Sequence, residues 1–261
     1  MTTEVSAHSY WIGYKTILIK EVTRILRIWP QTLIPPVITM SLYFVIFGSI
    51  IGRRVGEMGG IDYMEFIVPG LIMLSVITNS YGNITSSFFG AKFGKHIEEL
   101  LISPLPPWII LAGYVSGALF RALGVGVLVW LVAGFFSGFF MHNALVTVSI
   151  LILTAVVFAF GGFINAVYAQ KFDDIAIIPT FVLQPMTYLG GVFFSVGLLP
   201  GLWEQVAMGN PILYMVNALR YGMLGISDVP LGLAYVMVVG FAFLLGTLSL
   251  WLLKRGVGLR A

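Results

Sequence analysis

The chain has 261 residues, of which 59% are hydrophobic and 10% are charged, and its mean hydropathy is +0.99; this composition excludes a soluble globular domain and indicates an integral membrane protein. The absence of cysteine excludes disulfides, iron–sulfur clusters and thiol catalysis. The net charge of +3 lies mainly at the chain ends and in short loops, so it reports membrane topology rather than nucleic-acid binding.

The first predicted element is an amphipathic helix over residues 10–29. Its apolar residues recur at helical spacing and form one stripe: Trp11, Tyr14, Leu18, Val22, Ile25 and Trp29. The basic residues Lys20, Arg24 and Arg27 fall on the opposite side. This pattern predicts a helix that lies on the membrane surface.

Six apolar segments that follow are each long enough to cross a hydrocarbon core of about 30 Å. They are residues 33–51, 66–90, 109–136, 144–168, 175–196 and 231–253. Residues 197–230 are too polar and too interrupted by Gly and Pro to cross the membrane, yet too apolar for an ordinary loop, so we predict re-entrant or interfacial helices there. The whole chain, residues 1–261, is thus predicted to be one all-α transmembrane domain.

The distribution of Lys and Arg predicts the orientation of these spans. With the N-terminus inside, the cytoplasmic flanks hold Lys15, Lys20, Arg24, Arg27, Lys92, Lys95, Lys171, Lys254, Arg255 and Arg260. The outer flanks hold only Arg53, Arg54 and Arg220. Both termini are therefore predicted to be cytoplasmic.

A short charged segment separates the second and third spans. Residues 95–103 are predicted to form an amphipathic helix that Pro104 ends. One face is apolar and carries Ile97, Leu100 and Leu101. The other face is charged, and Lys95 can pair there with Glu98 at i+3 and with Glu99 at i+4. So short a helix needs support for its apolar face. That support is either the protein itself or lipid headgroups, or a groove of a soluble partner.

Several kinds of active site are absent from the sequence. The stretch "GAKFGKH", from Gly90 to His96, has too few residues between its glycines for a phosphate-binding loop and lacks the following Ser or Thr, so the chain is not expected to bind ATP. All eleven acidic residues, from Glu4 to Asp228, fall outside the six predicted spans, which disfavours an ion-coupled secondary transporter. No metal-ligand spacing or hydrolase motif is present, which disfavours a membrane enzyme.

The second span carries an unusually polar run, "TNSYGNITSS", at residues 78–87. Small polar residues of this kind either mediate helix packing or line a translocation path. If they line a path, Asn79, Tyr81 and Asn83 are the candidate residues.

Arg121 and a group of aromatic residues are further candidates. Arg121 lies deep in the third span, where an unpaired charge is costly, so it either extends toward the membrane interface or binds backbone carbonyls or a phosphate-bearing substrate. The fifth span carries Phe181, Tyr188, Phe193 and Phe194. These rings form either an aromatic wall for an amphiphile or a subunit interface.

Most of the chain resembles the ABC type-2 transporter permease family. The resemblance is carried by residues 27–52, 63–83 and 86–106 and by the stretches "FDDIAIIPTFVLQPMTYLGGVFFSVGLLP" and "NPILYMVNALRYG". The last two stretches hold the more specific signature, namely Pro185, Gly190, Gly191, Pro200, Asn210, Pro211 and Arg220.

This resemblance implies a six-helix permease of the bacterial inner membrane that dimerises and exports an amphiphile such as a drug, lipid or glycan. It implies two copies of a separate cytoplasmic ATPase subunit that bind ATP and Mg, with no cofactor and no nucleic acid on this chain. By resemblance, residues 10–29, with Arg24 and Arg27, and a coupling helix at 95–103 contact the ATPase, and residues 197–230 form re-entrant helices.

Overall fold

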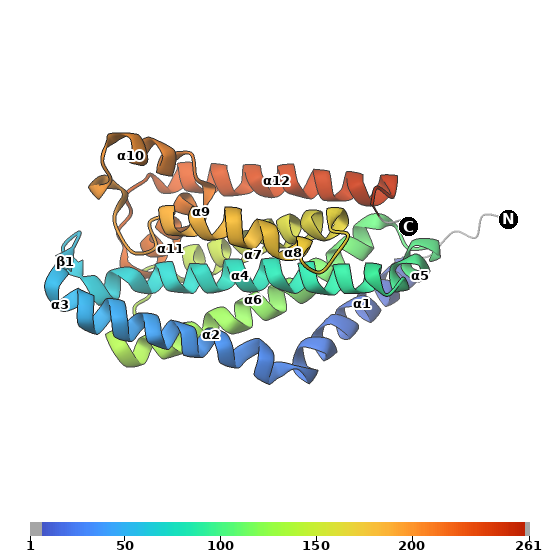
Figure 1. Cartoon of the computed structure of the whole chain (residues 1–261), viewed down its shortest axis with the longest axis horizontal. Coiled ribbons are helices and arrows are strands. Elements are labelled where there is room, and N and C mark those ends of the chain that lie inside the picture. Colours follow the sequence, from blue (N-terminus) through green and yellow to red (C-terminus); the bar gives the residue numbers. More distant parts are fainter. Residues whose placement is uncertain (1–6, 259–261) are drawn as a thin grey trace.

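The computed structural model describes residues 7–258 and consists mainly of helices joined by loops, with one β-hairpin of two-residue strands (Figure 1). The helices and strands are α1 (Ala7–Arg27), α2 (Trp29–Tyr43), η1 (Phe44–Ile51), α3 (Gly52–Val55), β1 (Glu57–Met58), β2 (Ile61–Asp62), α4 (Tyr63–Phe93), α5 (His96–Ile102), α6 (Pro107–Ser137), α7 (Ala144–Tyr168), α8 (Asp174–Ile178), η2 (Pro179–Leu183), α9 (Gln184–Leu189), η3 (Val196–Leu198), α10 (Gly201–Met208), α11 (Pro211–Leu224) and α12 (Leu231–Arg255). The strands pair antiparallel, with Glu57 opposite Asp62.

Five helices are long and apolar enough to cross a membrane. They are Trp29–Val55, which joins α2, η1 and α3, together with α4, α6, α7 and α12. At about 1.5 Å per residue, even the shortest of them, at 25 residues, exceeds the thickness of the hydrocarbon core. The integral membrane class and five of the predicted spans are therefore confirmed. The prediction that every acidic residue lies outside the spans is wrong for Glu65, because α4 begins at Tyr63 and Glu65 lies in its first turn. Glu4 and Arg260 lie outside the described residues.

The remaining predicted span, residues 175–196, is helical only as far as Leu189. The helix runs through α8, the π-helical segment η2 and α9, and the backbone then turns at Gly190 and Gly191, where Gly191 has φ +72°. The carboxylate of Asp174 accepts hydrogen bonds from the backbone N–H groups of Gln170 and Lys171, which hold the pKa of that carboxyl below its ordinary value. Within the described residues, a sixth continuous spanning helix is thus not present.

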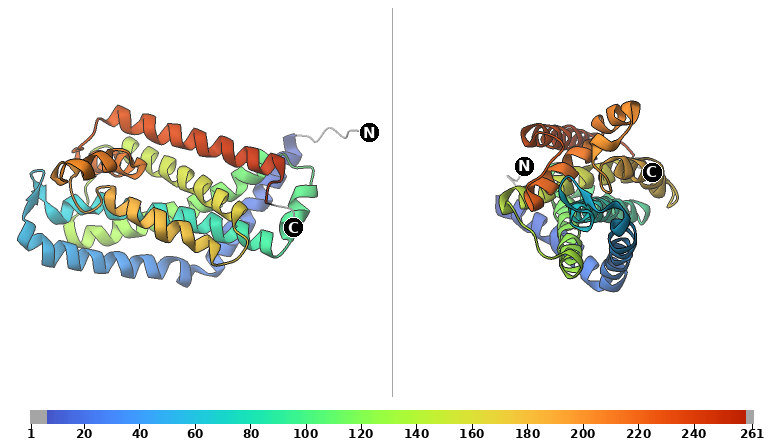
Figure 2. Two further views of the ribbon diagram at one scale, coloured as in Figure 1. Left: turned by 45° about the horizontal axis from the view of Figure 1, so that its top comes forward. Right: turned by 90° about the vertical axis from the view of Figure 1, so that its left-hand side faces the viewer.

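Helix α4 lies at the centre of the bundle and packs against α6 and α7, while α12 packs against α7 and α11 (Figures 1 and 2). Its apolar residues, such as Phe66, Ile77 and Phe88, are almost fully buried because neighbours surround them on all sides. At one end of this core, the Phe88 ring lies 4.5 Å from the Phe163 ring of α7.

The two ends of the bundle differ in what they carry. Helix α5 lies at the same end as the start of α1 and the end of α12, on the right in Figure 1, whereas α3, the hairpin and α10 lie at the other end. At the α5 end, Nζ of Lys92 donates to the carbonyl oxygens of Val167 and Ala169, at 2.6 and 2.8 Å, and so caps α7. The exposed Arg53 and Arg54 lie at the opposite end.

The close contact between α7 and α4 depends on one glycine. A Cβ atom on Gly162 would lie 2.5 Å from the Tyr81 carbonyl oxygen, whereas a Cβ atom on Gly161 would lie 3.6 Å from the Tyr81 ring. We expect Gly162→Ala to destabilise the protein by about 1–3 kcal/mol, because α4 must move, and Gly161→Ala to be tolerated. Melting temperatures of the two variants in detergent would test this; equal values would contradict it.

Candidate functional site

Three polar residues follow one face of α4 at intervals of four residues, and each contacts a charged side chain of another helix. Oδ1 of Asn79 accepts a hydrogen bond from Nε of Arg121, on α6, at 3.2 Å. Oδ1 of Asn83 accepts one from Nη2 of Arg24, on α1, at 2.8 Å. The third residue, Ser87, lies one turn closer to α5. The charges of two neighbouring helices therefore converge on this face of α4.

Ser87 binds a carboxylate that is completely buried. Its hydroxyl donates to Oε1 of Glu21 at 2.6 Å, and Nη2 of Arg24 donates to the other carboxylate oxygen at 3.0 Å. Glu21 has an exposure of 0%. A Cβ atom on Gly117 would lie 2.6 Å from Cβ of Glu21, so this glycine lets α1 approach α6 closely. An ion pair within α1 is thus attached to α4 through Ser87 and Asn83.

The buried face of α1 differs from the predicted stripe. The residues that face the bundle are Ile17, Glu21 and Ile25, whereas Trp11 is 60% exposed and Trp29 is 53% exposed. The prediction that Arg24 lies on the outer face is wrong, because Asn83 and the buried carboxylate hold its guanidinium inside. Arg27, one turn further along, is exposed as predicted.

Two other hydroxyl groups of the polar run pack α4 against α7. Ser80 donates to the carbonyl oxygen of Ala155, and Thr85 donates to that of Gly162. For these two residues the helix-packing interpretation is confirmed.

A cavity of about 430 Å³ opens beside the polar face of α4. Its walls come from α2, α4, α6 and the η2–α9 segment. Of the predicted pathway residues, Asn79, Tyr81, Arg121 and Tyr188 line it, and Asn83 does not. The structure therefore brings four of these residues, from three segments that are distant in sequence, to one cavity.

The aromatic residues of the fifth predicted span do not all line the cavity. Phe181 is 74% exposed and is not part of the cavity lining. Phe193 stacks on Phe47 at a centroid distance of 4.5 Å and packs against Tyr43, so its ring is used in packing within the chain. Neither Phe181 nor Phe193 lines this cavity, whereas Tyr188, whose ring stacks on that of Phe193 at 6.3 Å, does.

Helix α5 is supported by the chain itself. Ile97 is 1% exposed, and Leu100 and Leu101 pack partly buried against the same cluster. The protein itself therefore covers Ile97, and the alternative in which the groove of a soluble partner covers this residue is wrong. The exposed apolar side chains that directly flank α5 include Phe93, 61% exposed, and Ile102, 86% exposed, which the sequence did not indicate.

The turn from α4 into α5 leaves the charges of α5 unpaired with one another. Lys95 has a left-handed conformation, with φ +60°, and precedes the helix, which begins at His96. No ion pair joins Lys95 to Glu98 or Glu99 among the described residues, so the predicted pairs are wrong. Both carboxylates are exposed on the outer face of α5.

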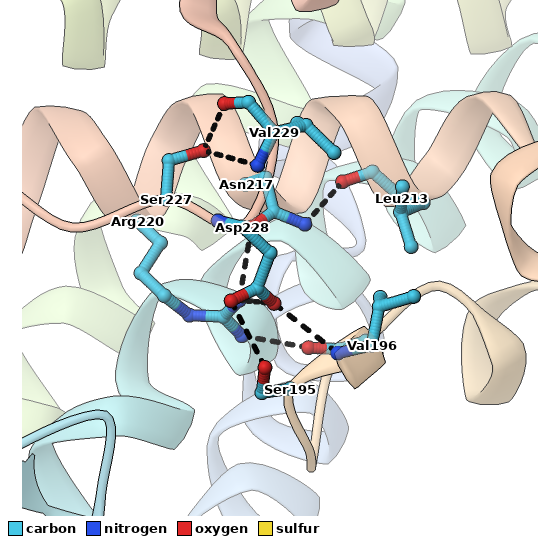
Figure 3. A network of polar contacts seen from close by, with 9 residues as sticks. Ser195, Val196, Leu213, Asn217, Arg220, Ser227, Asp228 and Val229 are labelled. Carbon is cyan, nitrogen blue, oxygen red and sulfur yellow. Dashed lines mark hydrogen bonds and ion pairs between the residues drawn. The ribbon is translucent and has the colours of Figure 1, made fainter. Parts of the chain in front are cut away.

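Between α9 and α12 the chain is held by a buried arginine (Figure 3). Nη2 of Arg220 donates to the Gly191 carbonyl oxygen at 2.6 Å, and its Nη1 lies 4.0 Å from Oδ2 of Asp228. Asp228 in turn accepts from the Ser195 hydroxyl at 2.9 Å and from the Val196 N–H at 3.2 Å. Arg220 is 1% exposed and belongs to α11. Including it among the basic residues of the outer flanks, when the orientation was predicted, was therefore wrong.

The chain matches known transport proteins over most of its length. A family model described as "ABC-2 type transporter" matches residues 13–224. The chain is 53% identical to a protein of Escherichia coli (strain K12) named "Inner membrane transport permease YadH", over 97% of this chain and 99% of that protein. It is 26% identical to "Nodulation protein J" of Rhizobium meliloti (strain 1021), over 82% of each chain.

Proposed function

Because the chain belongs to the ABC-2 type transporter family, we propose that it is the permease of an ATP-driven exporter, that it forms a homodimer, and that two copies of a cytoplasmic ATPase bind to it. Membership of this family confirms the resemblance to ABC type-2 transporter permeases that the sequence showed. The chain is a transmembrane transporter subunit, which is not itself an enzyme and which works with an ABC ATPase. In the proposal, ATP and Mg are bound by that ATPase.

One observation carries the proposal of coupling through α5. This short helix lies between two membrane helices, is anchored through the buried Ile97, and presents Glu98, Glu99 and Ile102 outward. An apolar side chain surrounded by charges at the end of a bundle suits a groove on a soluble protein. The start of α1 lies at this end of the bundle as well (Figure 1), whereas the exposed Arg27 is the last residue of that helix and lies away from α5.

The proposed mechanism is a shift between two states of the permease. Closure of the ATPase subunits on ATP moves α5, and α4 follows because only Gly94 and Lys95 separate the two helices. Helix α1 moves with α4, because the Glu21 carboxylate binds both Arg24 of its own helix and Ser87 of α4. The 31-residue helix α4 then changes the shape of the cavity at Asn79.

The placement of the bundle in the membrane follows the distribution of basic residues. We place the α5 end in the cytoplasm, where Lys254 and Arg255 border a second cavity beside α5, and Arg53 and Arg54 outside the bacterial inner membrane. Helices α10 and α11 have 8 and 14 residues, too short to cross, which supports re-entrant helices within residues 197–230.

The cavity supports an amphiphilic cargo and a second copy of the chain. It combines apolar residues such as Met40 and Leu183 with polar ones such as Asn79 and Thr187. Among the residues that the structure describes, no carboxylate lines it, which disfavours coupling to an ion gradient. Exposed apolar residues flank it on α2 and η2, among them Ile38, 54% exposed, and a homodimer would cover them.

We expect Ile102→Asp to reduce co-purification with the ATPase by about tenfold or more, since it buries a charge in an apolar groove. Val55→Asp, at the end of α3 on the opposite side of the bundle, is the matched control and should retain the ATPase. The measurement is the ratio of the two subunits after affinity purification.

Equal retention by both variants would contradict the docking role of α5. The exporter itself is tested separately in proteoliposomes that contain both subunits. Export must then require ATP, and flux driven by an ion gradient without the ATPase would refute the proposed function.

A further inference from the structure

We propose that Arg121 and Asn79 bind the anionic head of the transported amphiphile, a phosphate or carboxylate attached to an apolar group. This inference rests on the proposed function and names the substrate class for the same cavity. It starts from a comparison of the arginines inside the helical bundle.

Among the described residues, three arginines lie within the bundle, and two of them have a carboxylate nearby. Arg24 contacts the Glu21 carboxylate at 3.0 Å. Arg220 lies 4.0 Å from Asp228 and stacks on the Phe66 ring at 3.9 Å. Arg121 has no carboxylate within 4.0 Å in the described part of the chain. Its charge is therefore the one left uncompensated.

The position of Arg121 makes this absence costly. It lies near the middle of α6, half-buried, far from either end of a 31-residue membrane helix. An unpaired charge at this depth is unfavourable, and such residues generally serve a substrate or ion pathway. The side chain does not extend to the membrane interface, because its Nε donates to Asn79 on the neighbouring helix.

Asn79 holds the guanidinium in a defined orientation. The Nδ2 group of Asn79 donates to the Ser75 carbonyl oxygen at 3.0 Å, so its Oδ1 is directed at Nε of Arg121. Nη1 and Nη2 of Arg121 have no partner in the described part of the chain, and neither is a fully buried atom. They are thus free to donate two parallel hydrogen bonds, the geometry that matches phosphate and carboxylate.

The rest of the cavity suits the apolar part of such a molecule. Met40, Leu74 and Leu183 contribute aliphatic surface, and Tyr43 and Tyr188 contribute rings. A volume of about 430 Å³ is much larger than a small inorganic anion needs. The combination of one cation with apolar walls therefore points to an amphiphile rather than to free phosphate.

The experiment measures equilibrium binding of a fluorescent short-chain phosphatidic acid to the full-length permease, purified in non-ionic detergent without the ATPase. Unlabelled dioctanoyl phosphatidic acid should compete, while dioctanoylglycerol and inorganic phosphate should compete at least about tenfold more weakly. Competition by inorganic phosphate at the same concentration would assign the site to a soluble anion and overturn the proposal.

Two variants remove the site by different routes. Arg121→Gln removes the charge, and Asn79→Asp keeps the arginine but gives it an internal carboxylate partner; each should weaken binding of the phosphatidic acid by about tenfold or more. Arg121→Lys should restore part of the affinity, and the exposed Arg53→Gln should leave it unchanged. Should Arg121→Gln fail to fold, Asn79→Asp decides the question.

Unchanged affinity in Asn79→Asp or in a folded Arg121→Gln protein would overturn the proposal. Because binding is measured without the ATPase, that result would leave the proposed exporter intact. A failure of ATP-dependent export would instead refute the proposed function and leave the measured binding as it stands.

Discussion

Arg220→Met is expected to destabilise the permease by roughly 3 kcal/mol or more. The substitution leaves the Gly191 carbonyl oxygen without the donor that lies at 2.6 Å, removes the cation from the face of the Phe66 ring at 3.9 Å, and leaves Asp228 without its cationic neighbour. Since Asp228 is partly exposed, with 28% of its side-chain surface accessible, its own contribution is the smallest of the three.

The measurement is the melting temperature of the purified permease in detergent, with the monodisperse yield as a second readout. Arg220→Lys keeps the charge but not the planar guanidinium, so it should recover only part of the lost stability. Arg53→Met, an exposed arginine, is the control and should melt as the wild type does. An Arg220→Met protein as stable as this control would show that the network in Figure 3 is dispensable.

Removal of Arg24 is expected to cost about 3 kcal/mol, and more than removal of Glu21. Arg24→Met leaves the carboxylate of Glu21 buried, with an exposure of 0%, and without its cation. Glu21→Gln, in contrast, leaves behind a guanidinium that is 29% exposed and still hydrogen-bonded to Asn83. The double variant should be more stable than Arg24→Met alone, because no charge then remains unpaired.

A double-mutant cycle on the melting free energies measures this interaction. Arg27→Met is the matched control, since Arg27 is exposed on the same helix and should not affect the stability of the isolated permease. Additive effects of the two single substitutions would show that Arg24 and Glu21 do not stabilise each other.

The long apolar helices could be predicted from the sequence, and the orientation of charged side chains could not. Length and mean hydropathy were enough to predict the five spanning helices, because each is at least 25 residues long and predominantly apolar. The buried face of α1 was misplaced because Glu21, a charged residue, occupies its centre. Gly113 and Gly117, four residues apart on α6, are the signal that could have revealed a helix packed closely there.

Other errors share the same physical origin. Counting charges in flanking segments assigned Arg220 to a loop, since composition does not show that Asp228 and the Gly191 carbonyl oxygen would satisfy it inside the bundle. The amphipathic pattern of α5 showed that Ile97 would be covered, but not which molecule would cover it. Arg121 was located correctly, whereas its contact with Asn79 required the structure.

The left-handed backbone at Lys95 determines how α5 can respond to force. The Cβ atom of lysine disfavours φ +60°, so this conformation is held by its surroundings: the Lys95 N–H donates to the Lys92 carbonyl oxygen at 3.0 Å, and the Lys95 carbonyl oxygen accepts from the Glu98 N–H at 3.2 Å. These hydrogen bonds on both sides of Lys95 stiffen the elbow between α4 and α5. A stiff elbow transmits torque. A force that a bound partner applies to α5 therefore tilts or twists α4 as a whole, instead of bending the chain locally between the two helices.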